Sequence, residues 1–196
     1  MTAHPTTWTR GGFVTVVDQH AEANVVFRIN PESLSRTLTA RPAGRSSPVG
    51  ERLTGPPAEK VTMTIWLDAF DAAAHGSDHP PGTIEAELSA LEMLLYPAES
   101  QVRRALGSSA ALPLNESFAA PLVLLVWGRN RIAPVRLSSY SVTEEAFDAD
   151  LAPVRATVQV SLTVLSYADV PPTHPATAEF LAYQRQKAGL AKGATR

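Results

Sequence analysis

The sequence of 196 residues contains no cysteine. A chain without thiols has no disulfide, no zinc site built on thiolates and no cysteine nucleophile. Long apolar runs are also missing, since none reaches the ~18 residues that a membrane-spanning helix needs. The first residues lack a basic start followed by an apolar stretch, so we expect no secretory signal. Apolar residues make up 44% of the chain, which is enough to predict a buried core in a single domain.

A strong net charge is absent as well, because 17 basic and 19 acidic side chains give a formal charge of −2. This balance does not favour nucleic-acid binding. The charge is unevenly distributed, however: residues 1–60 carry +2, residues 61–150 carry −7 and residues 151–196 carry +3. The separation is consistent with chance segregation on a solvated surface, or with a polar molecule that stacks head to tail.

Sixteen prolines and eleven glycines predict many turns and a loop-rich, mainly β protein. Residues 59–68 and 154–164 alternate strictly between apolar and polar side chains, which is the period of a half-buried strand. Further strands are predicted at residues 12–17, 25–29, 34–39, 122–127 and 132–142, with a break at Pro134. Residues 20–24 between the first two strands are interpreted as a hairpin turn.

One internal helix is predicted at residues 83–95, with Thr83 as N-cap. Its apolar face consists of Ile84, Leu88, Leu91 and Leu95. Residues 40–58 and 98–120 are expected to be long exposed loops, the second with room for a short helix. We therefore divide the chain into a β domain at residues 1–170 and a proline-led tail at residues 171–196. In the tail, residues 177–191 form either a docked helix or a frayed end.

The polar faces of two predicted strands are small and uncharged. They consist of Thr62, Thr64, Thr157, Gln159, Ser161 and Thr163. Threonine favours strands in general, so this pattern has a purely local explanation. The alternative is a face that lines a water-filled bore. A single chain has too few strands for such a bore, but copies that pair edge to edge in a closed ring would supply them.

Titratable residues do not converge on a catalytic pattern. His75 and His79 are four residues apart, but Gly76 and Pro80 argue against the helix that would place both rings on one face. An acidic cluster is interpreted as a solvated turn: Glu144, Glu145, Asp148 and Asp150. The sequence contains no G-x-S-x-G elbow and no GxxxxGK[ST] phosphate loop. We expect no catalytic residue, no metal site and no cofactor.

Several short motifs follow one another in a characteristic order. They are Asn30-Pro31 and Leu34 after an aromatic strand, Trp127-Gly128, Tyr140, Phe147, and Pro153 with Arg155 at the start of a long alternating strand. Over residues 12–167 this order resembles the tube-protein family of contractile injection systems, the phage-tail-like particles of bacteria. It is most similar to the baseplate-proximal tube initiator without a C-terminal LysM-type module. The turn before Pro153 departs from the family pattern, because it reads Asp150-Leu151-Ala152 instead of containing glycine.

The resemblance implies a mainly β fold, a β-sandwich or half-barrel of the phage tail-tube type with one packed helix. It implies a non-enzymatic structural protein whose homo-hexameric ring encloses a β-barrel lumen and links the inner tube to the baseplate. The implied partners are sister copies, the inner tube protein, the spike or hub protein and other baseplate subunits, without nucleic acid or membrane insertion. Assembly is expected in the bacterial cytoplasm, where the particle either stays or is released.

The motif residues would then serve packing and interfaces. Asn30-Pro31 would set the turn that leaves an edge strand, and Trp127-Gly128 would anchor a hairpin. Pro153 would fix entry into the last strand, and Arg155 would pair with an acid such as Glu144 or Asp148. Two alternatives remain open: a stand-alone β-barrel that binds a small ligand in a closed pocket, and a small hydrolase that uses His75, His79 and the nearby aspartates Asp71 and Asp78.

Overall fold

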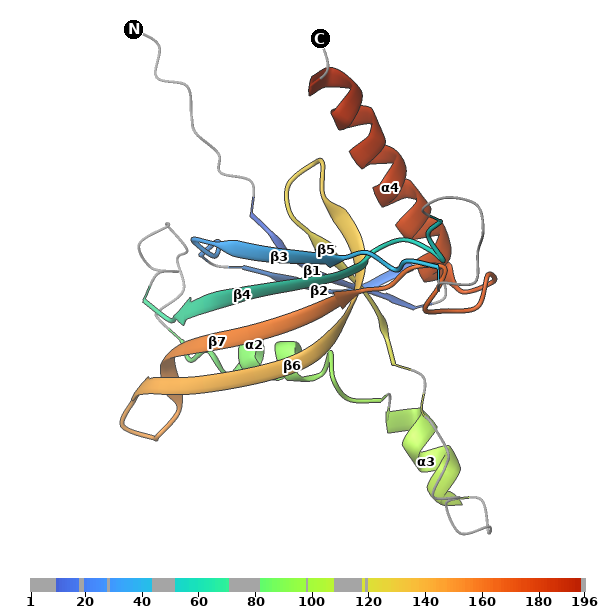
Figure 1. Cartoon of the computed structure of the whole chain (residues 1–196). Helices are drawn as coiled ribbons and strands as arrows, with labels where there is room; N and C mark the ends of the chain where they lie inside the picture. Colours follow the sequence, from blue (N-terminus) through green and yellow to red (C-terminus); the bar gives the residue numbers. More distant parts are fainter. Residues whose placement is uncertain are drawn as a thin grey trace, which may run out of the picture.

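Seven antiparallel strands form one sheet in the order β2-β1-β5-β6-β7-β4-β3 (Figure 1). The computed structural model describes residues 10–17, 20–27, 29–43, 52–70, 82–97, 99–107, 118 and 120–194. The strands are β1 (Gly12–Val17), β2 (His20–Val26), β3 (Leu34–Thr39), β4 (Ala58–Asp68), β5 (Leu122–Val126), β6 (Ile132–Phe147) and β7 (Pro153–Val164). The helices are α2 (Glu85–Glu92), α3 (Glu99–Gly107) and α4 (Pro175–Ala194). The predicted mainly β class, with a helix after the fourth strand, is confirmed.

The sheet is curled, as the connection from β2 to β3 requires. The Gly11 N–H donates to Asn30 Oδ1 at 2.8 Å, so the chain is still beside β1 at Asn30. β3 begins at Leu34, and four residues of extended chain span only about 13 Å. In a flat sheet the five strand spacings between β1 and β3 would measure about 24 Å. The two margins of the sheet must therefore approach each other around the core.

The core lies on one side of the curled sheet. Phe13 and Phe27 meet edge to face, with ring centroids 5.3 Å apart. Every strand except β3 contributes buried apolar side chains, among them Val25, Ile65, Leu125, Val135 and Val158. The helix α2 adds Ile84, Leu88 and Leu91, and α4 adds Phe180 and Tyr183. Both helices therefore cover the same side of the sheet and leave the other side of β3, β4, β7 and β6 bare.

Two strand predictions need correction. The hairpin turn predicted at residues 20–24 is wrong, because His20–Val26 is strand β2, and its His20 pairs with Val17. Pairing with β1 across a register shift at Thr15/Val16 overrides the weak strand propensity of these residues. The predicted break at Pro134 is wrong too, since β6 runs from Ile132 to Phe147 and Pro134 lies opposite Leu124.

The predicted internal helix is confirmed but shorter. α2 begins at Glu85 with Ile84 as N-cap, so the prediction of Thr83 as the cap is wrong. The Ile84 N–H donates to the Pro153 carbonyl at 3.0 Å, which fixes the start of the helix to β7. Leu95 on the predicted apolar face is 44% exposed, and Leu94 is buried in its place, because regular helix ends at Glu92.

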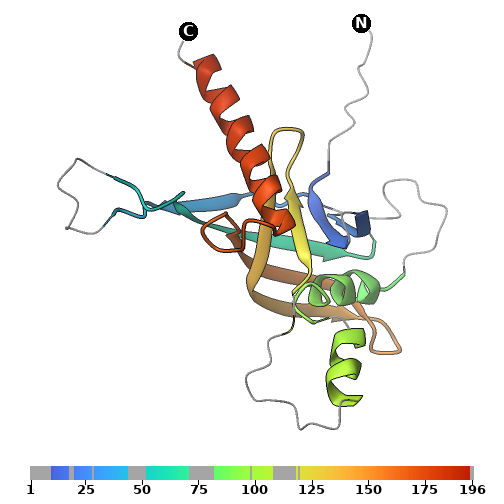
Figure 2. The same ribbon diagram turned by 90° about the vertical axis from the view of Figure 1, so that its right-hand side faces the viewer.

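The other two helices differ in how they pack. α3 lies within residues 98–120, which were predicted to be largely loop, buries no residue and stands away from the sheet (Figures 1 and 2). α4 confirms the predicted tail helix in its docked form, through buried Ala176, Phe180 and Tyr183. Within the described ranges, every helix is too short or too polar to cross a bilayer.

Close contact between β1 and β2 leads to a test of the sheet margin. A Cβ on Gly12 would lie 2.4 Å from the Val25 carbonyl oxygen, so Gly12→Ala forces the two strands apart. We expect the free energy of unfolding to fall by about 1–3 kcal/mol, measured by urea denaturation. Gly189→Ala is the control, because a Cβ there meets no atom within 4 Å and should add up to ~1 kcal/mol of helix stability. Equal effects of the two substitutions would contradict this account of the margin.

Candidate assembly surfaces

The bare side of the sheet carries mainly small polar side chains; Trp66, which lies opposite Thr157 and is 44% exposed, is a large aromatic residue on the same side. Antiparallel partners lie on the same side of a sheet, so the register shows which residues share it. Thr62 is opposite Ser161 and Thr64 is opposite Gln159 across β4 and β7. Across β7 and β6, Gln159 is opposite Ser141 and Thr157 is opposite Thr143. We define the hydroxyl face as Ser35, Thr37, Thr62, Thr64, Ser139, Ser141, Thr143, Thr157, Gln159, Ser161 and Thr163.

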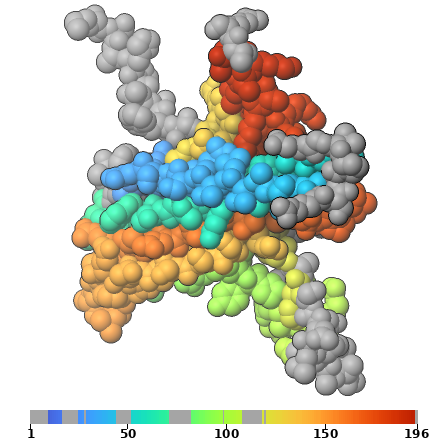
Figure 3. Space-filling model, in the orientation of Figure 1, coloured from blue at the N-terminus to red at the C-terminus, as the bar shows by residue number. Residues whose placement is uncertain are grey.

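All six residues predicted from the strand pattern lie on this hydroxyl face. The sequence interpretation missed its members on β3 and β6, namely Ser35, Thr37, Ser139, Ser141 and Thr143. Serine and threonine alternate with larger residues in both segments, and this alternation is the signal that identifies them. In the space-filling view, β3, β4, β7 and β6 lie side by side with no helix across them (Figure 3). Because the core and its helices lie on the opposite side of the sheet, the hydroxyl face stays exposed to solvent.

Charged side chains lie at the two ends of the hydroxyl face and not in its centre. At one end, Lys60 and Arg136 both lie opposite Thr163. At the other end, Arg155 Nε lies 3.0 Å from Asp68 Oδ2. There the Thr157 hydroxyl also donates to Glu145 Oε1 at 2.7 Å. The face thus has a basic end and an end where acids outnumber cations.

The sheet has two edge strands. In the described part of the chain, β2 pairs only with β1, and β3 pairs only with β4. The outer side of each edge strand therefore presents backbone donors and acceptors that a further strand can pair with.

The Asn30-Pro31 pair lies where the chain turns from β2 toward β3. Asn30 accepts the Gly11 N–H, and Pro31 is buried. Leu34 starts β3 opposite Met63 and packs against the core. Asn30 and Pro31 therefore lie at the turn by which the chain leaves the edge strand β2.

Trp127 and Gly128 form the start of the β5–β6 hairpin. The Trp127 ring packs 6.4 Å from that of Phe27, and Gly128 has a φ of +69°, which glycine adopts without a side-chain clash. Tyr140 is half-buried on the core side of β6. Its burial, together with Glu92 and Glu144, raises the pKa of its phenol to about 12.

The β6–β7 turn is flanked by Phe147 on one side and by Pro153 and Arg155 on the other. Phe147 ends β6 and is 49% exposed, opposite buried Pro153, the first residue of β7. The expected pairing of Arg155 with Glu144 or Asp148 is wrong, because Arg155 pairs with Asp68. β4 and β7 place these two residues directly opposite each other, although 87 residues separate them in sequence.

A buried carboxylate that the sequence analysis overlooked connects α4 to the sheet. Glu59 is 3% exposed, on the core side of β4. It accepts hydrogen bonds from Arg36 Nε at 2.7 Å, from the Tyr183 hydroxyl at 2.9 Å and from Lys187 Nζ at 2.8 Å. Burial alone would raise the pKa of Glu59, but the bonds from Lys187, Arg36 and Tyr183 outweigh it and hold the pKa below its ordinary value.

The residues considered for catalysis do not converge in the described part of the chain. His75 and His79 lie outside it. His174 Nδ1 accepts the Ala176 N–H at the start of α4, which is a structural role. The acidic cluster predicted to be a solvated turn is one only in part: Glu144 and Glu145 lie in strand β6, whereas Asp148 and Asp150 lie in the β6–β7 turn. Across the described ranges, no group of three histidine, aspartate or glutamate residues is placed to hold a metal ion.

Fold and surfaces together define a mainly β protein with a packed core, an open polar sheet face and two free edges. The family model of the contractile injection system tube protein matches residues 14–169. The chain belongs to this family and is a structural tube protein of such a system. Proteins of this kind assemble with other injection-system subunits. No curated protein matches the chain.

The Glu59 cluster yields a test of how α4 is held. Glu59→Gln keeps the shape but removes the charge that Arg36 and Lys187 face, so we expect the free energy of unfolding at pH 7 to fall by about 2 kcal/mol. A carboxylate with a lowered folded-state pKa stabilises above its unfolded pKa and loses this contribution as pH falls through the folded value. The difference between wild type and variant should therefore shrink below about pH 4.3.

The matched control is Glu99→Gln, which removes an exposed carboxylate from its pair with Arg103 on α3. Exposed pairs contribute little, so this variant should unfold like wild type. The measurement is the denaturation midpoint of wild type and of both variants from pH 3 to pH 7. A Glu59→Gln difference that stays constant over this range would contradict the assigned ion pairs.

Proposed function

We propose that this tube protein forms the ring that links the inner tube to the baseplate hub or spike and initiates tube assembly. The observation that carries the proposal is the hydroxyl face, a bare polar surface on four strands of a sheet with two free edges. In the proposed ring, this face lines the lumen, and sister copies complete the sheet on either side.

The chemistry of the hydroxyl face suits a channel. Thr62, Ser141, Gln159 and Ser161 at its centre are polar and uncharged, so they hydrate the wall without binding a charged cargo tightly. An ordinary exposed face carries more lysine and glutamate. The residues of the hydroxyl face are open to solvent, and no described helix covers them. The interior of a small closed barrel, by contrast, is filled by side chains.

The free edges suit lateral assembly. If β3 of one copy pairs with β2 of the next, each sheet continues into its neighbour and the exposed backbone groups are satisfied. Such an interface is heterologous, so it must close by rotation to give a ring and not a filament. The resemblance implies six copies. Glu59 and Arg36 brace β3 and β4 from the core side, which keeps this edge in a fixed shape.

The role in initiation is supported by the difference between the two ends of the molecule. α4 and the β5–β6 hairpin lie at one end, and the β6–β7 turn lies at the other (Figures 1 and 2). A ring built from such subunits has two chemically distinct faces, one for the tube and one for the hub. α3 stands away from the sheet with Leu106 64% exposed, in a position to contact a neighbouring subunit.

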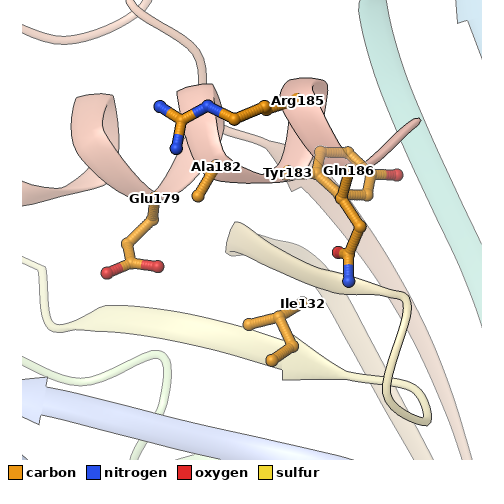
Figure 4. Close-up of a pocket in the computed structure, with 6 residues that line it drawn as sticks. All are labelled: Ile132, Glu179, Ala182, Tyr183, Arg185 and Gln186. Carbon is orange, nitrogen blue, oxygen red and sulfur yellow. The ribbon is translucent and has the colours of Figure 1, made fainter. Parts of the chain in front are cut away.

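The alternative of a small-ligand module calls for a closed pocket inside the chain. In the described core this space is filled by buried side chains, with Phe13, Ile65 and Leu162 almost fully enclosed. An open groove lies instead between α4 and the start of β6 (Figure 4), and it is lined by Ile132, Glu179, Ala182, Tyr183, Arg185 and Gln186. No observation on the described residues therefore favours this alternative over assembly.

The absence of cysteine permits a direct test of the lumen. Thr62→Cys on the hydroxyl face and Ser89→Cys on α2 are both exposed in the single chain and should react equally with a bulky maleimide there. In assembled particles we expect the cysteine at position 62 to be shielded from the bulky reagent, while the one at position 89 still reacts. Mass spectrometry of the labelled subunits gives the readout. Equal labelling at both positions in the particle would reject the proposed lumen.

A further inference from the structure

One large aromatic side chain lies among the small residues on the bare side of the sheet. Trp66 of β4 is 44% exposed there, opposite Thr157 of β7. β3 begins at Leu34, opposite Met63, so no described strand flanks Trp66 on its other side. An indole offers a large flat surface for contact, and tryptophan is enriched where proteins bind partners. The core does not enclose this ring, which leaves it accessible to a binding partner.

A carboxylate is fixed near this ring. The Thr157 hydroxyl donates to Glu145 Oε1 at 2.7 Å, which holds the Glu145 side chain on the same side of the sheet as Trp66. β4 and β6 are two strand spacings apart, about 10 Å. The indole, the hydroxyl and the carboxylate therefore form a row across three neighbouring strands. We call Trp66, Thr157 and Glu145 the indole–carboxylate row.

The negative charge of this row is not compensated within the described part of the chain. The neighbouring carboxylate of Asp68 has its own cation, because its Oδ2 lies 3.0 Å from Arg155 Nε. Glu145 instead accepts a hydrogen bond from a neutral hydroxyl, and no described cation forms an ion pair with it. The face of an indole attracts cations through its ring electrons. A cation placed over the row would therefore be attracted by the ring and by the carboxylate together.

The guanidinium group of arginine matches these two contacts. It is planar, so it stacks on an aromatic ring, and its N–H groups form hydrogen bonds to a carboxylate. The ammonium group of lysine is compact and strongly hydrated, so it is suited to the carboxylate but not to stacking on the indole. The row is present once in each copy of the chain, and in the proposed ring it would recur around the channel at one level.

We propose that the indole–carboxylate row binds arginine side chains of an extended polypeptide that lies along the hydroxyl face. The binding site belongs to the single chain, whereas passage of the polypeptide through a channel rests on the proposed function. A single exposed contact between a cation and an indole is weak. Several rows around a channel would act together on one polypeptide, while each contact still breaks easily enough to let it move on.

Nuclear magnetic resonance of the single chain in solution tests the site. The probe is the capped peptide Gly-Arg-Gly-Arg-Gly, and the readout is the indole N–H signal of Trp66, which is identified by its loss in Trp66→Thr. We expect the peptide to shift this signal. Glu145→Gln keeps an acceptor for the Thr157 hydroxyl but removes the charge, so it should weaken peptide binding about fivefold. The same peptide with citrulline in place of arginine has nearly the same shape without the charge and should cause little shift.

Two matched variants control for general effects of charge and aromatic surface. Glu99→Gln removes an exposed carboxylate from α3, and Tyr96→Thr removes an exposed aromatic ring beyond the end of α2. Both variants should bind the arginine peptide like wild type. Equal binding of the arginine and citrulline peptides, or a Glu145→Gln variant that binds the arginine peptide as tightly as wild type, would overturn the proposal.

The labelling experiment on assembled particles separates this proposal from that of the ring. If the cysteine of Thr62→Cys is shielded in the particle but the single chain does not bind the arginine peptide, the arginine site is wrong and the lumen stands. If the single chain binds the peptide but this cysteine reacts freely in the particle, the arginine site stands and its position in a lumen is wrong.

Discussion

The alternation of apolar and hydroxyl side chains along β4, β6 and β7 is the constraint on which the rest of the structure depends. Each fully buried valine, leucine or isoleucine on the core side contributes about 1.5–3 kcal/mol. A slip of one residue in register would expose these side chains and bury the hydroxyls. The register is therefore fixed by the core, and the hydroxyl face is held in place as its consequence. The hydroxyl face of each subunit therefore has a fixed shape before any partner binds.

A polar network complements this apolar constraint. Glu59 joins β4, β3 and α4 through Arg36, Tyr183 and Lys187. β3 is the edge strand that the proposed ring shares with a neighbour, and α4 covers part of the core through Phe180 and Tyr183. One buried carboxylate thus fixes both the edge strand β3 and the position of α4. This arrangement offers a physical reason for placing a charge beside the apolar side chains of the described core.

Sequence patterns predicted the strands and the helix whose apolar and polar residues follow a regular period. Strict alternation identified β4 and β7, and the six predicted face residues share one side of the sheet. The errors at residues 20–24 and at Pro134 arise because pairing with the neighbouring strand of a hairpin overrode the local propensities, whereas the helix start at Ile84 depends on a bond to Pro153, which is distant in sequence. The same reason explains why Arg155 was assigned the wrong acid and why Glu59 was overlooked: their partners are distant in sequence. The turn at Leu151 could be recognised as glycine-free from the sequence, but the left-handed backbone of Leu151, with a φ of +65°, is known only from the structure.

The most direct test of the account is a high-resolution electron-microscopy reconstruction of the particle that contains this chain. The account predicts that β3 of each copy is hydrogen-bonded to β2 of its neighbour around a hollow axis, with Thr62, Gln159 and Ser141 facing the channel. A reconstruction in which β2 and β3 remain unpaired between copies, or in which the hydroxyl face lies on the outer wall, would contradict it.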